Sequence, residues 1–432
     1  MIYYSTNNKS LTANLETAVT QGLAKDKGLY MPEIIPALPA DFFSRLSEMS
    51  LQEIAFEVAN SIFGSDIEAE DLKRIVNETL CFDIPLVKVR ENIYSLELFH
   101  GPTLAFKDVG ARFMARMLAH FTKNKKGDTI NVLVATSGDT GSAVANGFLG
   151  VEGIKVFVLY PKGLVSEIQE KQFTTLGQNI TALEIDGTFD DCQRIVKSAF
   201  MDDELQSKLV LTSANSINVA RFLPQAFYYF YAVGQLQKLG IKENIVCSVP
   251  SGNFGNITAA LIGKMQGLPI SRFIAANNRN DVFLEYIETK EYRPRPSVAT
   301  IANAMDVGDP SNFARILDLY KHSHEAISNE IAATRYDDEQ IRKTMVATFE
   351  KDGYLLDPHG ACAFQALEDM LKDGETGFFI ETAHPAKFLE TVEETIGQKV
   401  EIPLPLQEFM KGTKQSIELS KDYEDFKAFM LK

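Results

Sequence analysis

The chain has 432 residues, a formal net charge of −15 at pH 7, 45% hydrophobic residues and 23% charged residues. This acidic but ordinary globular composition argues against nucleic-acid binding, which calls for a basic surface, and no apolar run is long enough for a membrane span or a signal peptide. Its four scattered cysteines have no metal spacing and are expected to be reduced thiols, so we expect a cytoplasmic protein with no metal, membrane or nucleic acid as partner. For the oligomeric state we expect a monomer or homodimer.

Residues 1–90 are predicted to form a mainly helical N-terminal domain. Apolar residues recur at helical spacing over Leu51–Phe63 and Ile67–Leu80, and a shorter helix is predicted from Leu15 to Leu23. No residue pattern in this stretch carries evident chemistry. We interpret it as a packing or lid domain.

The segment Glu97–Asp108 turns at Gly101-Pro102 and then enters a helix. The apolar stripe of this helix is formed by Phe106, Val109, Phe113, Met114, Met117, Leu118 and Phe121. Lys107 lies off the stripe at the helix start, beside Gly110 and Ala111, whose small size would let a flat ligand approach. Most helical lysines simply lie in water, so the case for Lys107 depends on the loops that follow it.

From Ile130 onward, short apolar runs alternate with helical segments, which predicts an α/β fold with a parallel sheet covered on both faces. The predicted strands are Ile130–Ala135, Lys155–Tyr160, Thr181–Ile185, Leu209–Thr212, Ile245–Val249, Arg272–Ala276 and Gly377–Glu381. We expect an α/β catalytic domain of two subdomains at residues 91–385 and a charged helical extension at residues 386–432. In such sheets, ligands bind beyond the carboxyl ends of the strands.

The loop Pro250–Asn256 follows one of these strands and opens onto an apolar helix. Gly252 and Gly255 permit backbone conformations that turn N–H groups inward, and the helix start adds partial positive charge, so a phosphate is the natural ligand. A tight turn without a ligand would have the same glycines. The chain has neither the Gly-x-x-x-x-Gly-Lys-Ser/Thr pattern of a nucleotide P-loop nor a dinucleotide glycine fingerprint, so the loop predicts a phosphate without a visible nucleotide.

Three further loops follow strands. Thr136–Ser142 offers hydroxyls, N–H groups and a helix start to a carboxylate or phosphate. Ser213–Arg221 ends in an arginine, which suits bidentate binding of either anion, although an arginine on a solvated helix face would look the same. The two loops Pro250–Asn256 and Thr136–Ser142, which we expect on one sheet, suggest a phosphorylated cofactor and an acidic substrate. Thr382–Lys387 places His384 before Pro385, and we interpret this histidine as packed rather than catalytic.

The motifs, taken in this order, resemble those of the threonine synthases, a family of pyridoxal-phosphate enzymes of the tryptophan-synthase-β type, or fold type II. The resemblance runs over most of the chain. It includes Ala18–Leu23, Gly28–Pro32, Glu97–Asp108, Ala135–Gly141, Asn215–Asn218, Pro250–Asn256 and Thr382–Phe388. Each motif alone is weak, whereas their number and order are specific.

The resemblance implies roles for particular residues. Lys107 would be the Schiff-base lysine, and Thr382 the hydroxyl that faces the pyridine nitrogen and leaves the ring nearly neutral. The cradle for the cofactor phosphate would be formed by Gly252, Asn253, Phe254, Gly255 and Asn256.

The substrate contacts are hypotheses of our own. We assign the substrate carboxylate to Ser137, Gly138 and Thr140, and the substrate phosphate to Ser216, Asn218 and Arg221. Asp139 stands where relatives in the wider superfamily often have asparagine, so its contact with cofactor, substrate or neither is left open.

The implied reaction is the pyridoxal-phosphate-dependent conversion of O-phospho-L-homoserine and water into L-threonine and phosphate, the last step of threonine biosynthesis. It proceeds by γ-elimination and then β-addition of water, with Lys107 moving the protons. Two alternatives would fit the lysine and the phosphate loop alone. One is a pyridoxal-phosphate-dependent threonine or serine dehydratase, which would form an oxoacid from threonine. The other is a non-catalytic phospho-ligand sensor on the same fold, which would lack the absorption of a lysine-bound cofactor.

Overall fold

The computed structural model describes residues 1–123 and 129–432 and divides into two compact units. Unit 1 is formed by Met1–Ile2, Met31–Phe106 and Phe222–Glu401, and unit 2 by Tyr3–Tyr30, Lys107–Arg221 and Ile402–Lys432. Each unit therefore combines segments from the N-terminal, middle and C-terminal parts of the chain. The domain boundaries near residues 90 and 385 remain predictions of the sequence. The chain leaves unit 1 at Phe106 and enters unit 2 at the candidate lysine.

Unit 1 contains a mixed sheet with the strand order β12-β11-β10-β13-β5-β4. The strands are β4 Leu86–Arg90, β5 Ile93–Glu97, β10 Ile245–Pro250, β11 Arg272–Asn277, β12 Ile331–Arg335 and β13 Thr376–Glu381. Neighbouring strands pair in parallel, except that β4 and β5 form an antiparallel hairpin. β10 and β13 are buried along their whole length, as expected of central parallel strands, which read as near-continuous apolar runs.

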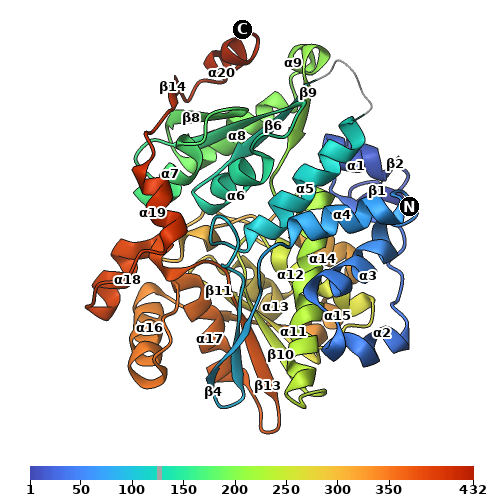
Figure 1. Ribbon diagram of the computed structural model, residues 1–432, viewed down its shortest axis with the longest axis vertical. Helices are drawn as coiled ribbons and strands as arrows, with labels where there is room; N and C mark the ends of the chain where they lie inside the picture. Colours follow the sequence, from blue (N-terminus) through green and yellow to red (C-terminus); the bar gives the residue numbers. More distant parts are fainter. Residues whose placement is uncertain (124–128) are drawn as a thin grey trace. The chain divides into compact units, whose positions relative to one another are not determined.

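The helix α17 (Pro358–Met370) packs against β10, β11 and β13, and α16 (Asp338–Asp352) packs against α17 (Figure 1). Phe364 and Leu367 of α17 share a buried core with Phe379 of β13. The other helices of unit 1 are α2 Ala40–Arg45, α3 Leu51–Phe63, α4 Ala69–Thr79, α11 Ala226–Lys238, α12 Gly255–Met265, α13 Val282–Thr289, α14 Phe313–Leu319, α15 His324–Glu330 and α18 Leu389–Ile396.

The N-terminal region is mainly helical, as predicted, and also contains short strands. These are β1 Ile2–Ser5, β2 Thr12–Asn14 and β3 Tyr30–Pro32. α3 has the bounds that the sequence predicted, and it begins at a capping box in which Ser50 and Glu53 each accept a hydrogen bond from the other's backbone N–H. Such a cap contributes about 1 kcal/mol. The buried face of α3, which includes Ile54 and Val58, packs against α11.

Unit 2 contains a fully parallel sheet with the strand order β14-β8-β7-β6-β9. The strands are β6 Ile130–Ala135, β7 Ile154–Pro161, β8 Ile180–Asp186, β9 Val210–Ser213 and β14 Ile417–Ser420. The helices are α1 Leu15–Gln21, α5 Lys107–Thr122, α6 Asp139–Phe148, α7 Glu167–Thr174, α8 Phe189–Ala199, α9 Asp203–Lys208, α10 Val219–Phe222, α19 Leu404–Lys411 and α20 Tyr423–Met430. The predicted C-terminal extension is divided between the units: α18 belongs to unit 1, whereas the part from Ile402 onward belongs to unit 2, where β14 pairs with β8 and α20 packs against α8.

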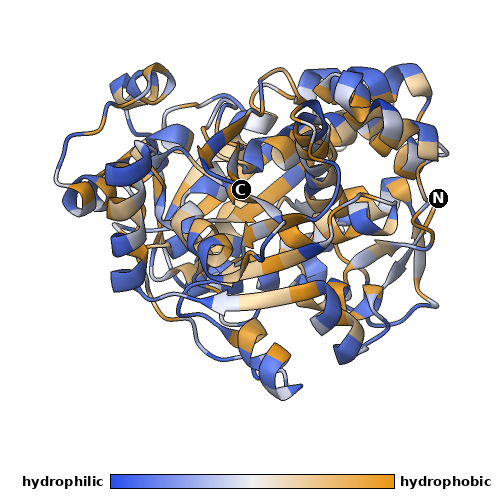
Figure 2. Cartoon of the chain, turned by 90° about the horizontal axis from the view of Figure 1, so that it is seen from below, coloured by the Kyte–Doolittle hydropathy of each residue, from blue (hydrophilic) through white to orange (hydrophobic). Residues whose placement is uncertain are grey.

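Apolar residues concentrate in the strands and on the inner faces of the helices, as the hydropathy colouring shows (Figure 2). Burial of this apolar area is the main driving force for folding, at roughly 25 cal/mol per Å². Across residues 1–123 and 129–432, we find no helix that combines the length and apolarity needed to cross a membrane.

Candidate active site

The predicted cofactor residues of unit 1 follow neighbouring strands. β10 pairs in parallel with β13, so the loop that begins after Pro250 and the segment that begins at Thr382 leave the same edge of the sheet. β5 pairs in parallel with β13 on its other side and ends at Glu97, where the segment toward Lys107 begins. The structure therefore gathers the phosphate loop, Thr382 and the approach to the candidate lysine at one edge.

The segment before Lys107 is held against the segment around Thr382 by backbone contacts. The N–H of Leu98 donates to the carbonyl of Glu381 at 3.0 Å, and the N–H of Phe106 donates to the carbonyl of Thr382 at 2.8 Å. Ala105 also forms a β-bridge with the residue after Thr382. Lys107 is the first residue of α5 and is half-buried. The residue preceding the candidate lysine is thus fixed beside the candidate ring partner.

The phosphate loop has the backbone that the sequence predicted. Phe254 adopts a left-handed conformation, with φ 61°, and α12 begins at the next residue. A Cβ on Gly252 would lie 2.7 Å from the Cα of Met305, so only glycine fits there. Among the hydrogen bonds of the described residues, none is donated by the backbone N–H of Gly252, Gly255 or Asn256. N–H groups without acceptors at a buried helix start fit a phosphate ligand.

Two asparagine side chains of this loop form hydrogen bonds with other residues of unit 1. The Oδ1 of Asn256 accepts hydrogen bonds from the hydroxyls of Tyr228 and Tyr229, the latter at 2.7 Å. The Oδ1 of Asn253 accepts from the N–H of Ser311 at 2.7 Å. The two tyrosines are buried in α11 and were not identified from the sequence, because nothing in the sequence links them to a loop some thirty residues away. They fix the loop so that its backbone remains available for a ligand.

In unit 2, the loop after β6 is arranged around Thr136. Its hydroxyl oxygen accepts from the N–H of Gly138 at 2.9 Å and from the N–H of Gly141 at 2.8 Å. Gly138 has a φ of 145°, which is unfavourable for other residues. Ser137 and Thr140, the other predicted substrate residues of this loop, are half-buried.

Asp139, whose partner the sequence left open, begins α6 and is 6% exposed. Its Oδ1 accepts a hydrogen bond from the Nε2 of Gln169 at 2.9 Å. Gln169 is buried on α7. A Cβ on Gly138 would lie 2.5 Å from the Oε1 of Gln169, so the Gln169 side chain packs directly against the glycine. Gln169 is a site residue that sequence reasoning missed, since it belongs to a different helix and its residue type gave no signal.

The third predicted loop lies next to the second because β9 pairs with β6. The Nδ2 of Asn218 donates to the carbonyl of Val19 at 2.8 Å, and the guanidinium of Arg221 donates to the carbonyl of Ala214 at 2.6 Å. Burial lowers the pKa of Arg221 to about 10, although the negative charge of Asp108 acts to raise it. Both side chains are buried and engage backbone carbonyls, whereas Ser216 is half-buried. A role of these three residues toward the substrate phosphate remains a prediction.

His384 is packed and hydrogen-bonded. Its Nδ1 accepts from the N–H of Ala386 at 3.1 Å, and its ring packs edge-on against Phe99 with centroids 5.3 Å apart. Burial, reinforced by the neighbouring His100, lowers the pKa of His384 to about 4. The imidazole is therefore neutral at physiological pH.

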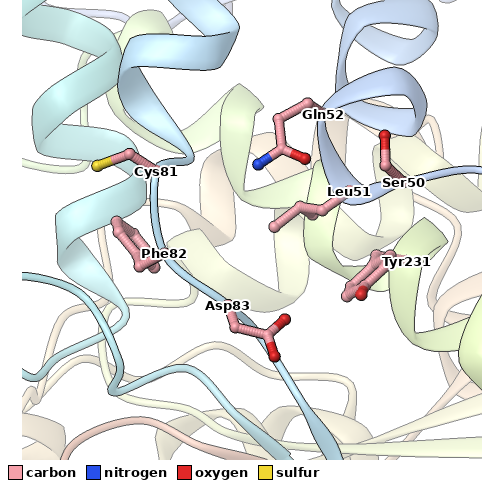
Figure 3. Close-up of a pocket in the computed structure, with 7 residues that line it drawn as sticks. All are labelled: Ser50, Leu51, Gln52, Cys81, Phe82, Asp83 and Tyr231. Atoms are coloured by element: carbon pink, nitrogen blue, oxygen red, sulfur yellow. The ribbon is translucent and has the colours of Figure 1, made fainter.

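A cavity of about 330 Å³ in unit 1 has none of these residues in its lining. It is lined by Ser50, Leu51, Gln52, Cys81, Phe82, Asp83 and Tyr231 (Figure 3). Gln52 donates to the carbonyl of Leu80 and Ser50 takes part in the α3 capping box, so these polar groups have structural partners. Within residues 1–123 and 129–432, no group of three or more His, Cys, Asp or Glu side chains is placed to hold a metal ion.

Family models match nearly the whole chain. A model for pyridoxal-phosphate dependent enzymes matches residues 76–377. Models described as threonine synthase N terminus and threonine synthase, C-terminal, match residues 2–80 and 360–430.

Individual proteins also match over 94% or more of their length. The chain is 45% identical to a threonine synthase of Haemophilus influenzae over 100% of both chains, and 43% identical to that of Escherichia coli over 94% of each. Among solved structures, the Escherichia coli threonine synthase has a TM-score of 0.94 at 41% identity, covering 100% of this chain and 99% of that one. A threonine synthase from Brucella melitensis with bound PLP has a TM-score of 0.93 at 34% identity, covering 100% and 98%.

Proposed function

The chain belongs to the threonine synthase family of pyridoxal-phosphate-dependent enzymes, and we propose that it converts O-phospho-L-homoserine and water into L-threonine and phosphate through the residues around Lys107. Its α/β fold is that of the fold type II enzymes, and its cofactor is pyridoxal phosphate. The substrate, the residues that bind it, a cytoplasmic location and a monomeric or homodimeric state are parts of the proposal.

The observation that carries the site assignment is the shared edge of the unit 1 sheet. The anion-binding loop after β10 and Thr382 after β13 lie on adjacent strands, and the Phe106–Thr382 hydrogen bond fixes the residue before Lys107 at that edge. The backbone N–H groups of Gly252, Gly255 and Asn256 would hold the cofactor phosphate, the Thr382 hydroxyl would contact the pyridine nitrogen, and the Lys107 amine would bind the aldehyde carbon. When bound, pyridoxal phosphate supplies an electron sink that stabilises negative charge on the substrate α carbon.

The amine of Lys107 is the proposed base. It removes the proton from the α carbon of the substrate and then a proton from the β carbon, so that the C–O bond at the γ carbon breaks and phosphate leaves. Water then adds its oxygen to the β carbon, and protons return to the substrate carbons to complete threonine. General acid–base catalysis of this kind contributes about 10²- to 10⁴-fold to a rate.

The loop after β6 is the proposed receptor for the substrate carboxylate. Ser137, Gly138 and Thr140 offer hydroxyl and N–H donors at the start of α6, where the helix dipole favours an anion. The hydrogen bond from Gln169 orients the Asp139 carboxylate, whose contact with cofactor or substrate stays open. Ser216, Asn218 and Arg221 are the weaker assignment, toward the substrate phosphate.

Product analysis tests the proposed reaction. The purified protein, supplied with pyridoxal phosphate and O-phospho-L-homoserine, should release threonine and phosphate in equal amounts. L-homoserine should give no threonine, because its hydroxyl is a poor leaving group, and L-threonine should give no 2-oxobutyrate. Phosphate together with 2-oxobutyrate would contradict the water-addition step. Oxoacid formation from threonine would instead favour the dehydratase.

The cofactor attachment has a separate test. Borohydride reduction of the holoenzyme, followed by peptide mapping, should place the reduced cofactor on Lys107. Attachment to a different lysine would overturn the site assignment while leaving the family unchanged.

A further inference from the structure

Asp357 is the N-cap of α17 and is completely buried. Its Oδ1 accepts hydrogen bonds from the backbone N–H and the ring Nδ1 of His359, each at 2.6 Å, and from the N–H of Gly360 at 3.4 Å. Its Oδ2 accepts from the N–H of Ala383 at 3.4 Å. Capping the helix requires only one side-chain oxygen, as a serine could supply. The second oxygen instead reaches a segment outside the helix.

The residues on both sides of Thr382 contact Asp357. Ala383 donates to its carboxylate, and the Oε1 of Glu381 accepts from the N–H of Asp357 at 2.6 Å. Burial, together with the charge of Asp357, raises the pKa of Glu381 well above its ordinary value, which favours an uncharged Glu381 and avoids a buried pair of like charges. Gly360 makes room for Glu381, since a Cβ there would lie 1.6 Å from the Oε2.

His359 extends these contacts toward the phosphate loop. Its Nε2 accepts from the N–H of Ala304 at 3.1 Å, so its Nδ1 carries the proton that is donated to Asp357. A Cβ on Gly252 would lie 2.9 Å from the carbonyl oxygen of Ala304 and 2.7 Å from the Cα of Met305, so this backbone lies directly behind the loop. His359 is 2% exposed. A continuous set of contacts therefore joins Ala383 to the backbone that supports Gly252.

We propose that Asp357 and His359 are positioning residues that set the separation between Thr382 and the phosphate loop, and so fit the site to pyridoxal phosphate. The inference rests on the proposed function, because it takes Thr382 and the loop Gly252–Asn256 as the two ends of the cofactor site. In this inference Asp357 and His359 act on the cofactor site indirectly, through the segments that they hold. Both act through backbone N–H groups, at Ala383 and at Ala304.

Two substitutions remove one contact each while preserving most of the packing. His359→Asn keeps a polar group near the Nδ1 position but is too short to accept from Ala304, whereas His359→Gln keeps an acceptor near the Nε2 position. Asp357→Asn still caps α17, but its single acceptor oxygen cannot serve both His359 and Ala383. Phe388→Leu is the matched control, because the Phe388 ring packs on the His359 ring, with centroids 4.9 Å apart, and donates no hydrogen bond to it.

The measurements are the dissociation constant of pyridoxal phosphate from each apoenzyme, by fluorescence titration, and the thermal unfolding midpoint of the same apoenzyme. We expect His359→Asn and Asp357→Asn each to raise the dissociation constant of pyridoxal phosphate by about tenfold. A change of this size corresponds to the loss of roughly one hydrogen bond to a charged or polar buried group. His359→Gln should recover part of that loss. Phe388→Leu should lower the unfolding midpoint while leaving the dissociation constant within about threefold of the wild-type value.

The inference is overturned if the wild-type protein binds the cofactor but His359→Asn and Asp357→Asn bind it within about threefold as tightly. It is equally overturned if Phe388→Leu has the same unfolding midpoint as His359→Asn and Asp357→Asn and weakens cofactor binding as much as they do. The loss of affinity would then follow from general destabilisation. Failure of the wild-type protein itself to bind pyridoxal phosphate would contradict the proposed function instead, so the two failures are distinguishable.

Discussion

The backbone N–H of Phe106 donates a 2.8 Å hydrogen bond to the carbonyl oxygen of Thr382. The next residue is Lys107, the proposed base, so the main chain that leads into Lys107 is held against the proposed ring partner. Because neither side chain takes part in this bond, substitutions at Lys107 or Thr382 test the chemistry of the site with little change to the backbone that holds it.

Replacement of Lys107 should abolish turnover. Lys107→Ala removes the amine, and Lys107→Arg keeps a positive charge but cannot act as a base, so each should lower threonine formation by about 10³-fold or more. The measurement is the rate of threonine release from O-phospho-L-homoserine. Lys88→Ala, at an exposed position of β4, is the control and should keep the wild-type rate. A Lys107→Arg protein with a tenth or more of the wild-type rate would eliminate Lys107 as the base.

Gly252→Ala should weaken cofactor binding. The new Cβ would lie 2.7 Å from the Cα of Met305, and overpacking of this kind costs about 1–3 kcal/mol, which corresponds to a roughly 5- to 150-fold increase in the dissociation constant. Equilibrium dialysis of the apoenzyme against pyridoxal phosphate measures this dissociation constant.

The control for Gly252→Ala is Gly353→Ala. Gly353 ends α16 with a φ of 66°, and a Cβ there meets no atom of the described residues within 4 Å. This substitution should lower stability by about 1 kcal/mol through backbone strain alone and leave cofactor affinity unchanged. Equal losses of cofactor affinity in both proteins would contradict a specific role of the Gly252 loop in binding the cofactor.

The hydroxyl of Thr382 should contribute one hydrogen bond to the cofactor. Thr382 is 8% exposed, so Thr382→Val keeps the shape but leaves the pyridine nitrogen without a donor, which should weaken cofactor binding by about fivefold, or roughly 1 kcal/mol. Thr382→Ser restores the hydroxyl and should bind nearly as well as the wild type. Titration of both apoenzymes with pyridoxal phosphate measures the two affinities. Tighter binding by Thr382→Val than by Thr382→Ser would argue against a hydrogen bond from Thr382 to the cofactor.

His384 should make stability depend on pH in a defined window. Its folded pKa is about 4, below the unfolded value near 6.5, so the folded state binds fewer protons. The contribution of His384 to stability is therefore fully present above pH 6.5 and is lost as the pH falls toward 4, by an amount on the order of 3 kcal/mol.

The test compares urea unfolding of the wild-type protein and His384→Gln at pH 7 and pH 4.5. The free energy of unfolding of the wild type should fall further than that of the variant across this interval. An equal fall in both proteins would mean that other groups account for the acid sensitivity.

The main strands could be predicted because central parallel strands are apolar throughout. β10 and β13 are examples, and the loops after them were identified for the same reason. β4 and β5 were not predicted. β4 alternates apolar and charged residues at the edge of the sheet, and β5 contains polar positions that pair with it in a short hairpin. Local sequence gives weak signals for such strands, whose stability comes from their partners.

The residues that support the site were harder to predict than the residues that form it. Tyr229 and Gln169 act through contacts with residues of other helices, and only the fold brings those partners together. Asp357 is a partial exception. An aspartate directly before a proline is a typical helix start, so its capping role could have been anticipated from the sequence. Its second contact, with Ala383, could not.

Turnover in water enriched in oxygen-18 tests the central claim most directly. If phosphate leaves by cleavage of the C–O bond at the γ carbon and water then adds at the β carbon, the label should appear in the hydroxyl group of threonine, and the released phosphate should be unlabelled. Mass spectrometry of both products measures this. Labelled phosphate accompanied by unlabelled amino acid would show that water attacks phosphorus, and would contradict the elimination and addition steps assigned to Lys107.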